Sequence, residues 1–343
     1  MADPRRRRAV LAATMLIAIT AVWGSSFAIS KDLLTRMSVP DYLALRFLTA
    51  ALVVGLVRPA ALFRAGWRVV SVGVFLGLIY FLGQLLQFVG LQHTAPTVSA
   101  FVVSMYVVFT PLFAAVLSRR LPTRRTALAT LLAATGVAVM SLRGFAVGWG
   151  ELLTLIAASL YAVHIVALGR WARAETAYAL AVVQLTTMGV VFLAAASTDG
   201  IQLPQRSDWP AFLYLALLAG GLAILVQTWA QAHLAAAVVA ILMVLEPVWA
   251  AVFGLAIFGE SLDRRVLIGA ALILLGLLVT ATTRWHGRRG VLTSTMETDA
   301  ITGYALSGRE AVGDPQHALD VDCATLDVVT DEALTLPDDA SPC

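Results

Sequence analysis

Ten long apolar stretches limit the fold of this chain more than any other feature. Each has about 20 residues, the length at which a helix crosses the roughly 30 Å hydrocarbon core of a bilayer. Only 13% of the 343 residues are charged, whereas a soluble domain carries about 25%. The sequence predicts an all-α integral membrane protein. Its predicted spans cover about 10–30, 41–57, 69–91, 95–118, 124–142, 147–168, 177–197, 209–232, 235–258 and 264–284.

A weak internal duplication relates the two halves of the chain. Pro111–Val116 reads PLFAAV and Pro247–Val252 reads PVWAAV, and an Arg-Arg pair precedes the next span in each half, at 124–125 and at 264–265. Each half then holds five spans, and an odd number makes the second half enter the membrane from the opposite face. The expectation is a pair of inverted five-helix repeats, as in many transporters. The predicted repeats cover residues 9–143 and 144–285.

Arginine and lysine near the ends of the spans indicate the orientation, because cytoplasmic loops carry an excess of both. With the N-terminus inside, sixteen of these residues fall in cytoplasmic stretches and six in outer stretches. Both termini are therefore predicted to be cytoplasmic, which requires an even number of spans. We expect a multi-pass protein of the cell (inner or plasma) membrane.

The C-terminal residues, 286–343, differ in composition from the rest of the chain. From position 290 on, eleven acidic residues face one base, Arg309, and few large apolar residues are present. Because such a segment buries too little apolar surface to fold, it is predicted to be a disordered acidic cytoplasmic tail. A regulatory or docking role and a solvated, silent tail both stay open.

Two charged residues are predicted to lie within spans. Glu246 is near the middle of its span, and a charge there costs roughly 2.5–3.5 kcal/mol on insertion scales. An apolar site favours the neutral form of a carboxyl group, so Glu246 could load and release protons; alternatively it is a permanent partner of a helix N-terminus or of Arg46. Arg46 could bind an anionic substrate group, or it could be half of a structural ion pair or reach the outer surface. Pro247, beside Glu246, and its counterpart Pro111 are predicted to kink their helices.

Other polar side chains within the spans are candidates for a cavity wall. Gln84 with Gln87, and Gln227 with Gln231, each share a helix face because they are three or four residues apart. These amides could line a cavity or could hold the bundle together by hydrogen bonds. His164 could relay protons or be hydrogen-bonded packing. Two tryptophans inside spans, Trp23 and Trp249, complete the candidate wall.

Several functional classes lack their sequence signatures. GxxxxGK[ST], HExxH and GxSxG are all absent, which disfavours ATP-driven pumps and intramembrane hydrolases. Both cysteines, Cys323 and Cys343, lie in the tail, and no Cys/His set has the spacing of metal ligands. The pI of 9.1 reflects arginines in loops facing a membrane and predicts no nucleic-acid partner. We therefore expect neither an enzyme nor a cofactor.

An ordered set of features resembles the drug/metabolite transporter superfamily, EamA type. The set comprises WGSSF from Trp23 in the first span, Arg46 in the second, and LEPVWAAVFGLAIFGE from Leu245 in the ninth. The resemblance covers about residues 9–285. It implies an inner-membrane carrier with a central cavity between two halves, alternating access without ATP, and peripheral fifth and tenth helices. Ser118–Pro122 departs from the Gly-Glu that often ends the fourth helix of similar proteins, such as Gly259-Glu260 in the second half.

Together these features predict a secondary active transporter of a small organic solute, such as a metabolite, an amino acid or a drug, with efflux favoured. The candidate substrate wall is Trp23, Gln84, Gln87, Gln227, Gln231 and Trp249. The candidate coupling charges are Glu246, Arg46 and His164. The expected partners are the solute and the lipid bilayer, with protons and a second copy of the chain left open. The competing hypothesis is a membrane-embedded sensor or enzyme that signals through the acidic tail.

Overall fold

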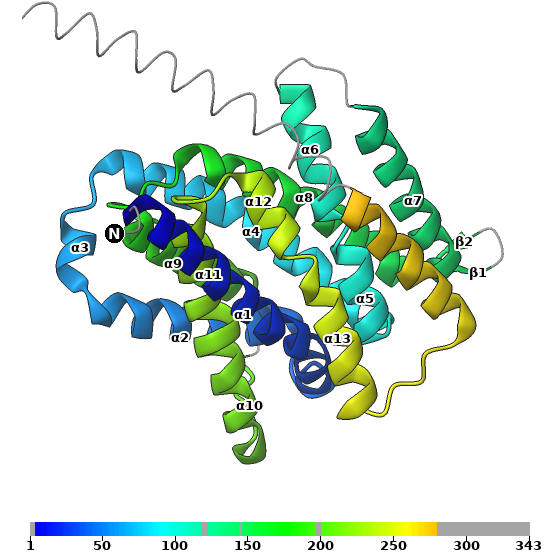
Figure 1. Cartoon of the computed structure of the whole chain (residues 1–343). Helices are drawn as coiled ribbons and strands as arrows, with labels where there is room; N and C mark the ends of the chain where they lie inside the picture. Colours follow the sequence, from blue (N-terminus) through cyan, green and yellow to red (C-terminus); the bar gives the residue numbers. More distant parts are fainter. Residues whose placement is uncertain (1–3, 118–122, 144–145, 197–199, 280–343) are drawn as a thin grey trace, which may run out of the picture. The chain divides into compact units, whose positions relative to one another are not determined.

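A computed structural model describes residues 4–117, 123–143, 146–196 and 200–279. These residues are helical apart from the loops and a hairpin of two short antiparallel strands (Figure 1). The predicted tail, 286–343, and the segment Ser118–Pro122 lie outside the described residues. The elements are α1 (Pro4–Leu33), α2 (Val39–Val57), α3 (Pro59–Phe63), α4 (Trp67–His93), α5 (Pro96–Val103), α6 (Tyr106–Leu117), α7 (Arg124–Ser141), β1 (Leu142–Arg143), β2 (Ala146–Val147), α8 (Trp149–Trp171), α9 (Ala177–Ala195), η1 (Arg206–Asp208), α10 (Trp209–Tyr214), the π-helix η2 (Leu215–Leu222), α11 (Ala223–Gln231), α12 (Ala236–Leu242) and α13 (Leu245–Ala256), followed by a helix over 264–279.

Eight helical segments in the described part of the chain are long and apolar enough to cross a membrane. They coincide with eight of the ten predicted spans. The other two predicted spans correspond to α7 and to helix 264–279, which are helical but do not meet that criterion over their described lengths. The all-α membrane architecture is confirmed, and the count of ten spans stays a prediction.

Two of the spans are interrupted near their middle. The fourth predicted span breaks at Ser104–Met105, between α5 and α6, and the ninth breaks at Met243–Val244, between α12 and α13. Both breaks come before the prolines expected to cause kinks. Pro247 lies in the first turn of α13, where its missing N–H costs nothing, and Pro111 lies inside the continuous helix α6.

The packing of one half repeats that of the other. Helix α4 packs against α8 and α9, and the corresponding segment of the second half, η2–α11, packs against α1 and α2. Likewise α1 packs against α13 while α8 packs against α5 and α6, and α2 packs against its counterpart α9. Each half therefore covers the other through equivalent helices.

Helix α7 and helix 264–279 run antiparallel. A Cβ atom at Gly136 would lie 2.6 Å from the carbonyl oxygen of Gly269, and one at Gly276 would lie 2.7 Å from that of Ala129. Later residues of one helix thus meet earlier residues of the other, at a separation that only glycine permits. The two Arg-Arg pairs that begin these helices consequently lie at opposite ends of the pair.

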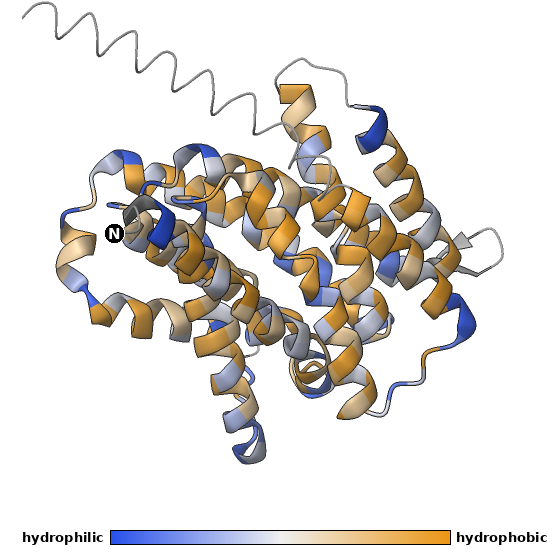
Figure 2. Ribbon diagram, in the orientation of Figure 1, coloured by the Kyte–Doolittle hydropathy of each residue, from blue (hydrophilic) through white to orange (hydrophobic). Residues whose placement is uncertain are grey.

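Apolar residues cover the outside of the bundle, and hydrophilic residues collect at helix ends and loops (Figure 2). Large side chains such as Leu52, Leu131 and Val190 are exposed on outward faces, as contact with lipid requires. The polar side chains of Arg46 and Glu246, in contrast, are buried within the spans. Apolar side chains outside and charged side chains inside are the reverse of the distribution in a soluble protein.

Candidate functional site

A polar cavity of ≈ 50 Å³ lies inside the bundle. Because one water needs about 10–15 Å³ by the same measure, this space holds about four waters, and an organic solute would require the helices to separate. Residues of both halves contribute to its wall. They are Trp23, Ser26 and Phe27 of α1; Arg46 and Phe47 of α2; Tyr80, Gln84, Gln87 and Phe88 of α4; Val103 and Tyr106; Tyr161, His164 and Ile165 of α8; Ala219 of η2; Ile224 and Gln227 of α11; and Met243 and Glu246.

Arg46 is held at this wall by a backbone carbonyl and by aromatic rings. Its Nε donates to the carbonyl oxygen of Leu215 at 3.1 Å, and its Nη1 donates to the Tyr42 hydroxyl at 3.2 Å. The guanidinium carbon lies 5.5–5.8 Å from the ring centroids of Tyr42, Phe47 and Phe88, within the range of cation–π attraction. Arg46 therefore neither forms an ion pair in the described part of the chain nor reaches the surface, since its exposed fraction is 3%.

The π-helix η2 explains where Arg46 finds its acceptor. Its carbonyl of Leu215 accepts from Arg46, and its carbonyl of Ala219 accepts from the Trp23 indole Nε1 at 3.0 Å. A π-helix is a rare conformation that is often found at functional sites. Here it offers two carbonyl groups to side chains of the other half, beside Gly220 and Gly221.

Glu246 has a tyrosine as its partner. The Tyr106 hydroxyl donates to Oε2 of Glu246 at 2.9 Å and also approaches the carbonyl oxygen of Met243 at 3.4 Å. Met243 lies four residues before Pro247, which has no N–H to donate to its carbonyl; this carbonyl accepts from the Glu246 N–H at 3.1 Å instead. The break between α12 and α13 thus presents both a carboxylate and a carbonyl at the cavity.

The amides of α4 bind a single tyrosine of the second half. Gln84 Nε2 donates to the Tyr161 hydroxyl at 2.8 Å, and this hydroxyl donates to Gln87 Oε1 at 2.6 Å. The Oε1 atom of Gln84 is buried without a hydrogen-bond partner. Gln84 therefore keeps one free acceptor at the cavity wall.

His164 is packed and hydrogen-bonded on one side only. Its Nε2 lies 2.8 Å from Oε1 of Gln184, and its ring contacts that of Tyr80 with centroids 4.8 Å apart. Its Nδ1 is buried without a partner. If Nε2 carries the proton and donates to Gln184, Nδ1 is a second free acceptor beside the cavity.

Of the remaining predicted wall residues, Gln227 lines the cavity, while Gln231 and Trp249 do not. Gln231 Nε2 donates to the carbonyl oxygen of Ile165 at 2.8 Å, which makes it part of the contact between α11 and α8. Trp249 is 38% exposed and stacks on Phe253. Trp249 lies one turn after Glu246 on α13, and its Cβ packs against Gly24 of α1.

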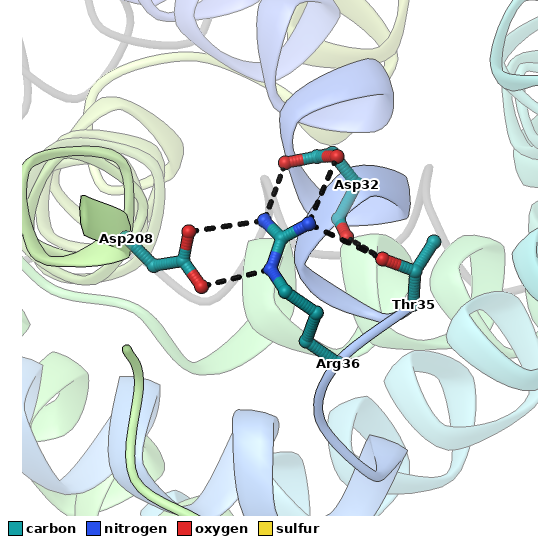
Figure 3. A network of polar contacts seen from close by, with 4 residues as sticks. All are labelled: Asp32, Thr35, Arg36 and Asp208. Atoms are coloured by element: carbon teal, nitrogen blue, oxygen red, sulfur yellow. Dashed lines mark hydrogen bonds and ion pairs between the residues drawn. The ribbon is translucent and has the colours of Figure 1, made fainter. Parts of the chain in front are cut away.

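One end of the bundle is closed by an ion-pair network that joins the two halves (Figure 3). Arg36 donates from Nε and Nη2 to the two oxygens of Asp208 at 2.9 and 3.0 Å, and from Nη2 to Asp32 at 2.6 Å. Hydrogen bonds to Asp32, and then to Asp208, raise the pKa of the Arg36 guanidinium above its usual range. The bidentate pair therefore persists at any physiological pH and ties the α1–α2 turn to η1.

Further polar contacts close the same end. The Lys31 ammonium donates to the carbonyl oxygen of Thr94, and the Thr94 hydroxyl donates to Glu151 Oε1 at 3.0 Å. The Thr97 N–H donates to Glu260 Oε2 at 3.4 Å. At the opposite end, a comparable link joins α9 to α2, where the Tyr178 hydroxyl donates to the carbonyl oxygen of Val54.

The cavity wall as a whole combines two charged groups of opposite sign with hydrogen-bonding groups and aromatic rings. It has a buried guanidinium and a buried carboxylate that are not paired with each other, free acceptors on Gln84 and His164, and several aromatic rings. In the described residues no group of three or more His, Cys, Asp or Glu side chains could hold a metal ion. The available chemistry is recognition of charge and hydrogen-bonding groups.

Sequence reasoning missed the aromatic part of this wall. Tyr80, Tyr106 and Tyr161 lie in predicted spans, but a tyrosine there is equally typical of packing. A signal existed for Tyr161, because the duplication aligns it with Trp23 at a separation of 138 residues, and both residues line the cavity.

Comparisons with known proteins agree with this architecture. A family model described as the EamA-like transporter family matches residues 10–142 and again 148–282. An uncharacterized transporter of Archaeoglobus fulgidus is 28% identical over 269 residues, which cover 78% of this chain and 84% of that protein. The crystal structure of another protein has a TM-score of 0.57 at 20% identity, over 79% of this chain and 96% of that one. At that identity, the structural likeness bears on the fold alone.

Proposed function

Because the chain belongs to the EamA-like transporter family of the drug/metabolite transporter superfamily, we propose that it carries a small zwitterionic solute of the amino-acid class across the membrane. The observation behind this choice is the pair of opposite charges, Arg46 and Glu246, that line one cavity without bonding to each other. A carboxylate fits a guanidinium fork, and an ammonium fits a carboxylate flanked by aromatic rings. The two charges of a zwitterion would satisfy both.

Alternating access supplies the transport cycle in this proposal. The support is that polar contacts join the two halves at the end that carries Arg36 and that the central cavity is too small for an organic solute. Opening at either end in turn would give the solute access from one face at a time. We propose ten spans in two inverted repeats, supported by the antiparallel packing of α7 against helix 264–279. Export is the favoured direction.

Proton coupling through Glu246 is the second part of the proposal. A carboxyl group in an apolar interior can be neutral or charged according to its surroundings, and Glu246 is 6% exposed beside the cavity. Binding of a substrate ammonium would favour the carboxylate, and release would allow protonation. Proton movement and solute movement would then be linked at one side chain.

The test is flux in liposomes that contain the purified protein. The panel comprises an amino acid, its uncharged-carboxyl amide, its deaminated acid, a nucleoside and a cationic drug, each with and without a pH gradient. We expect the zwitterion to be carried fastest and both single-charge analogues to lose at least tenfold in flux. Equal flux of the amide and the amino acid would contradict the zwitterion assignment.

The variant Glu246→Gln separates coupling from binding. It keeps a hydrogen-bond acceptor for Tyr106 and removes the titration, so we expect residual flux that no longer responds to the pH gradient. The matched control is Glu175→Gln, an exposed side chain outside the cavity. A full pH response in Glu246→Gln would show that coupling does not pass through this residue.

A further inference from the structure

At the end of the bundle opposite Arg36, three arginines line one hollow. Arg68 lies in the first turn of α4, Arg170 in the last turn of α8, and Arg173 just beyond it. All three are exposed, and together with Trp171 they surround a space of ≈ 550 Å³. None of these residues lines the central cavity.

Among the described residues, no acid compensates these three charges. The ion pairs recorded for the described residues all involve Arg36, and no acidic side chain lines the hollow. The acid nearest in sequence, Glu175, lines a neighbouring hollow with Arg58 and Arg64. Three unpaired arginines at one site favour an anionic ligand with several acceptor oxygens.

An apolar groove of ≈ 760 Å³ adjoins the arginine hollow. Arg170 and Trp171 line both spaces, and the rest of the groove wall includes Phe75, Phe113 and Val163. The Trp171 ring meets the edge of Phe75 with centroids 5.7 Å apart, so it forms the boundary between the charged and the apolar part. Tryptophan at such a boundary is typical of the membrane interface.

We propose that this composite surface binds an anionic phospholipid, with the headgroup phosphate on Arg68, Arg170 and Arg173 and an acyl chain in the groove. A soluble anion would match the arginines but would leave the adjoining groove unexplained, and a neutral lipid would match the groove alone. Basic pockets between spans on the cytoplasmic side are suited to anionic headgroups, and this end is the one predicted to face the cytoplasm. The site is independent of which solute the central cavity carries.

The test measures lipid binding to the full chain by native mass spectrometry. The probes are phosphatidylglycerol and phosphatidylcholine with the same acyl chains. We expect phosphatidylglycerol to bind at least tenfold more tightly.

Each arginine near a membrane surface contributes a factor of about five to the binding of an anionic lipid, so Arg68→Gln/Arg170→Gln/Arg173→Gln should remove most of this preference. The control with equal charge loss, Arg6→Gln/Arg7→Gln/Arg8→Gln, should keep it. Equal losses in both variants would overturn the site in favour of general attraction.

A second pair of variants tests the groove. Val163→Trp fills the groove from an exposed position and should weaken phosphatidylglycerol binding severalfold, whereas Val190→Trp on α9, outside the groove, should not. Inorganic phosphate at millimolar concentration should fail to compete. Competition by phosphate, or unchanged binding in Val163→Trp, would identify a soluble-anion site and overturn the lipid assignment. Size-exclusion elution as a single species excludes misfolded variants.

Discussion

Arg46 and Glu246 are charges that the bundle interior stabilises separately. Arg46 has a carbonyl, a hydroxyl and three aromatic rings, and Glu246 has the Tyr106 hydroxyl. Leaving a buried charge without partners costs several kcal/mol, whereas polar partners offset much of that cost. Each side chain is therefore stabilised at the cavity wall and keeps bonding capacity for a solute.

Arg46→Lys tests the fork geometry of the guanidinium. Lysine keeps the charge but cannot bond two oxygens in one plane, and hydrogen bonds to charged groups contribute about 1.5–3 kcal/mol. We expect the apparent affinity for a zwitterionic substrate to fall by about tenfold or more. Substrate titration measures it, with Arg264→Lys, away from the cavity, as the control. Unchanged affinity would mean that Arg46 is a structural residue.

His164→Phe decides between a proton relay and packing. The change leaves Oε1 of Gln184 without its donor, which costs about 1–3 kcal/mol when the group is buried. We expect a lower unfolding temperature and an unchanged pH response of flux, and a smaller loss of stability in His233→Phe, which is only partly buried. A stable protein that loses its pH response would instead support a relay through His164.

At the scale of elements, the interruptions of helices create the site. The break before α13 places the carbonyl of Met243 beside the Tyr106 hydroxyl, and two carbonyls of the π-helix η2 accept from Trp23 of α1 and Arg46 of α2. A backbone carbonyl has two lone pairs, so each can accept from a side chain of another helix in addition to a backbone N–H. The functional groups of this cavity therefore include backbone as well as side chains.

The sequence predicted the polar side chains of the site better than its backbone. Arg46, Glu246, Gln84 and His164 were identifiable because a polar group in an apolar span has a cost that needs a reason. The breaks and the π-helix were not, because tertiary packing decides them, and the prolines lie downstream of both breaks. The same packing takes Gln231 to the carbonyl of Ile165 and away from the cavity.

The ion pair of Arg36 with Asp208 is an element-scale prediction. In an Asp32→Asn background, which removes the second acidic partner of Arg36, either Arg36→Asp or Asp208→Arg replaces attraction by repulsion between the α1–α2 turn and η1, and the exchanged double variant restores it. A partly exposed pair contributes about 1 kcal/mol, so we expect each single variant to open this end about fivefold more often. Reactivity of a cysteine introduced at Ser26 measures the opening. Lack of recovery in the double variant would contradict a role of this pair in closure.

At the scale of the whole molecule, the proposed transport cycle depends on the relation between the two halves. Equivalent helices make equivalent contacts, and the cavity takes residues from both halves. The antiparallel contact of α7 with helix 264–279 is what an inverted pair of five-span repeats predicts. Parallel repeats would put Arg124 and Arg264 at the same end. The two halves could then not open opposite ends of the bundle by exchanging their conformations.

Labelling of positions 124 and 264 tests this relation most directly. Cys323 and Cys343 are replaced by serine, Arg124→Cys and Arg264→Cys are introduced singly, and intact cells are treated with a membrane-impermeant maleimide. The inverted arrangement predicts labelling of position 264 from outside, and of position 124 only after the membrane is permeabilised. Labelling of both positions from the same face would contradict the inverted repeats and, with them, the proposed transport cycle.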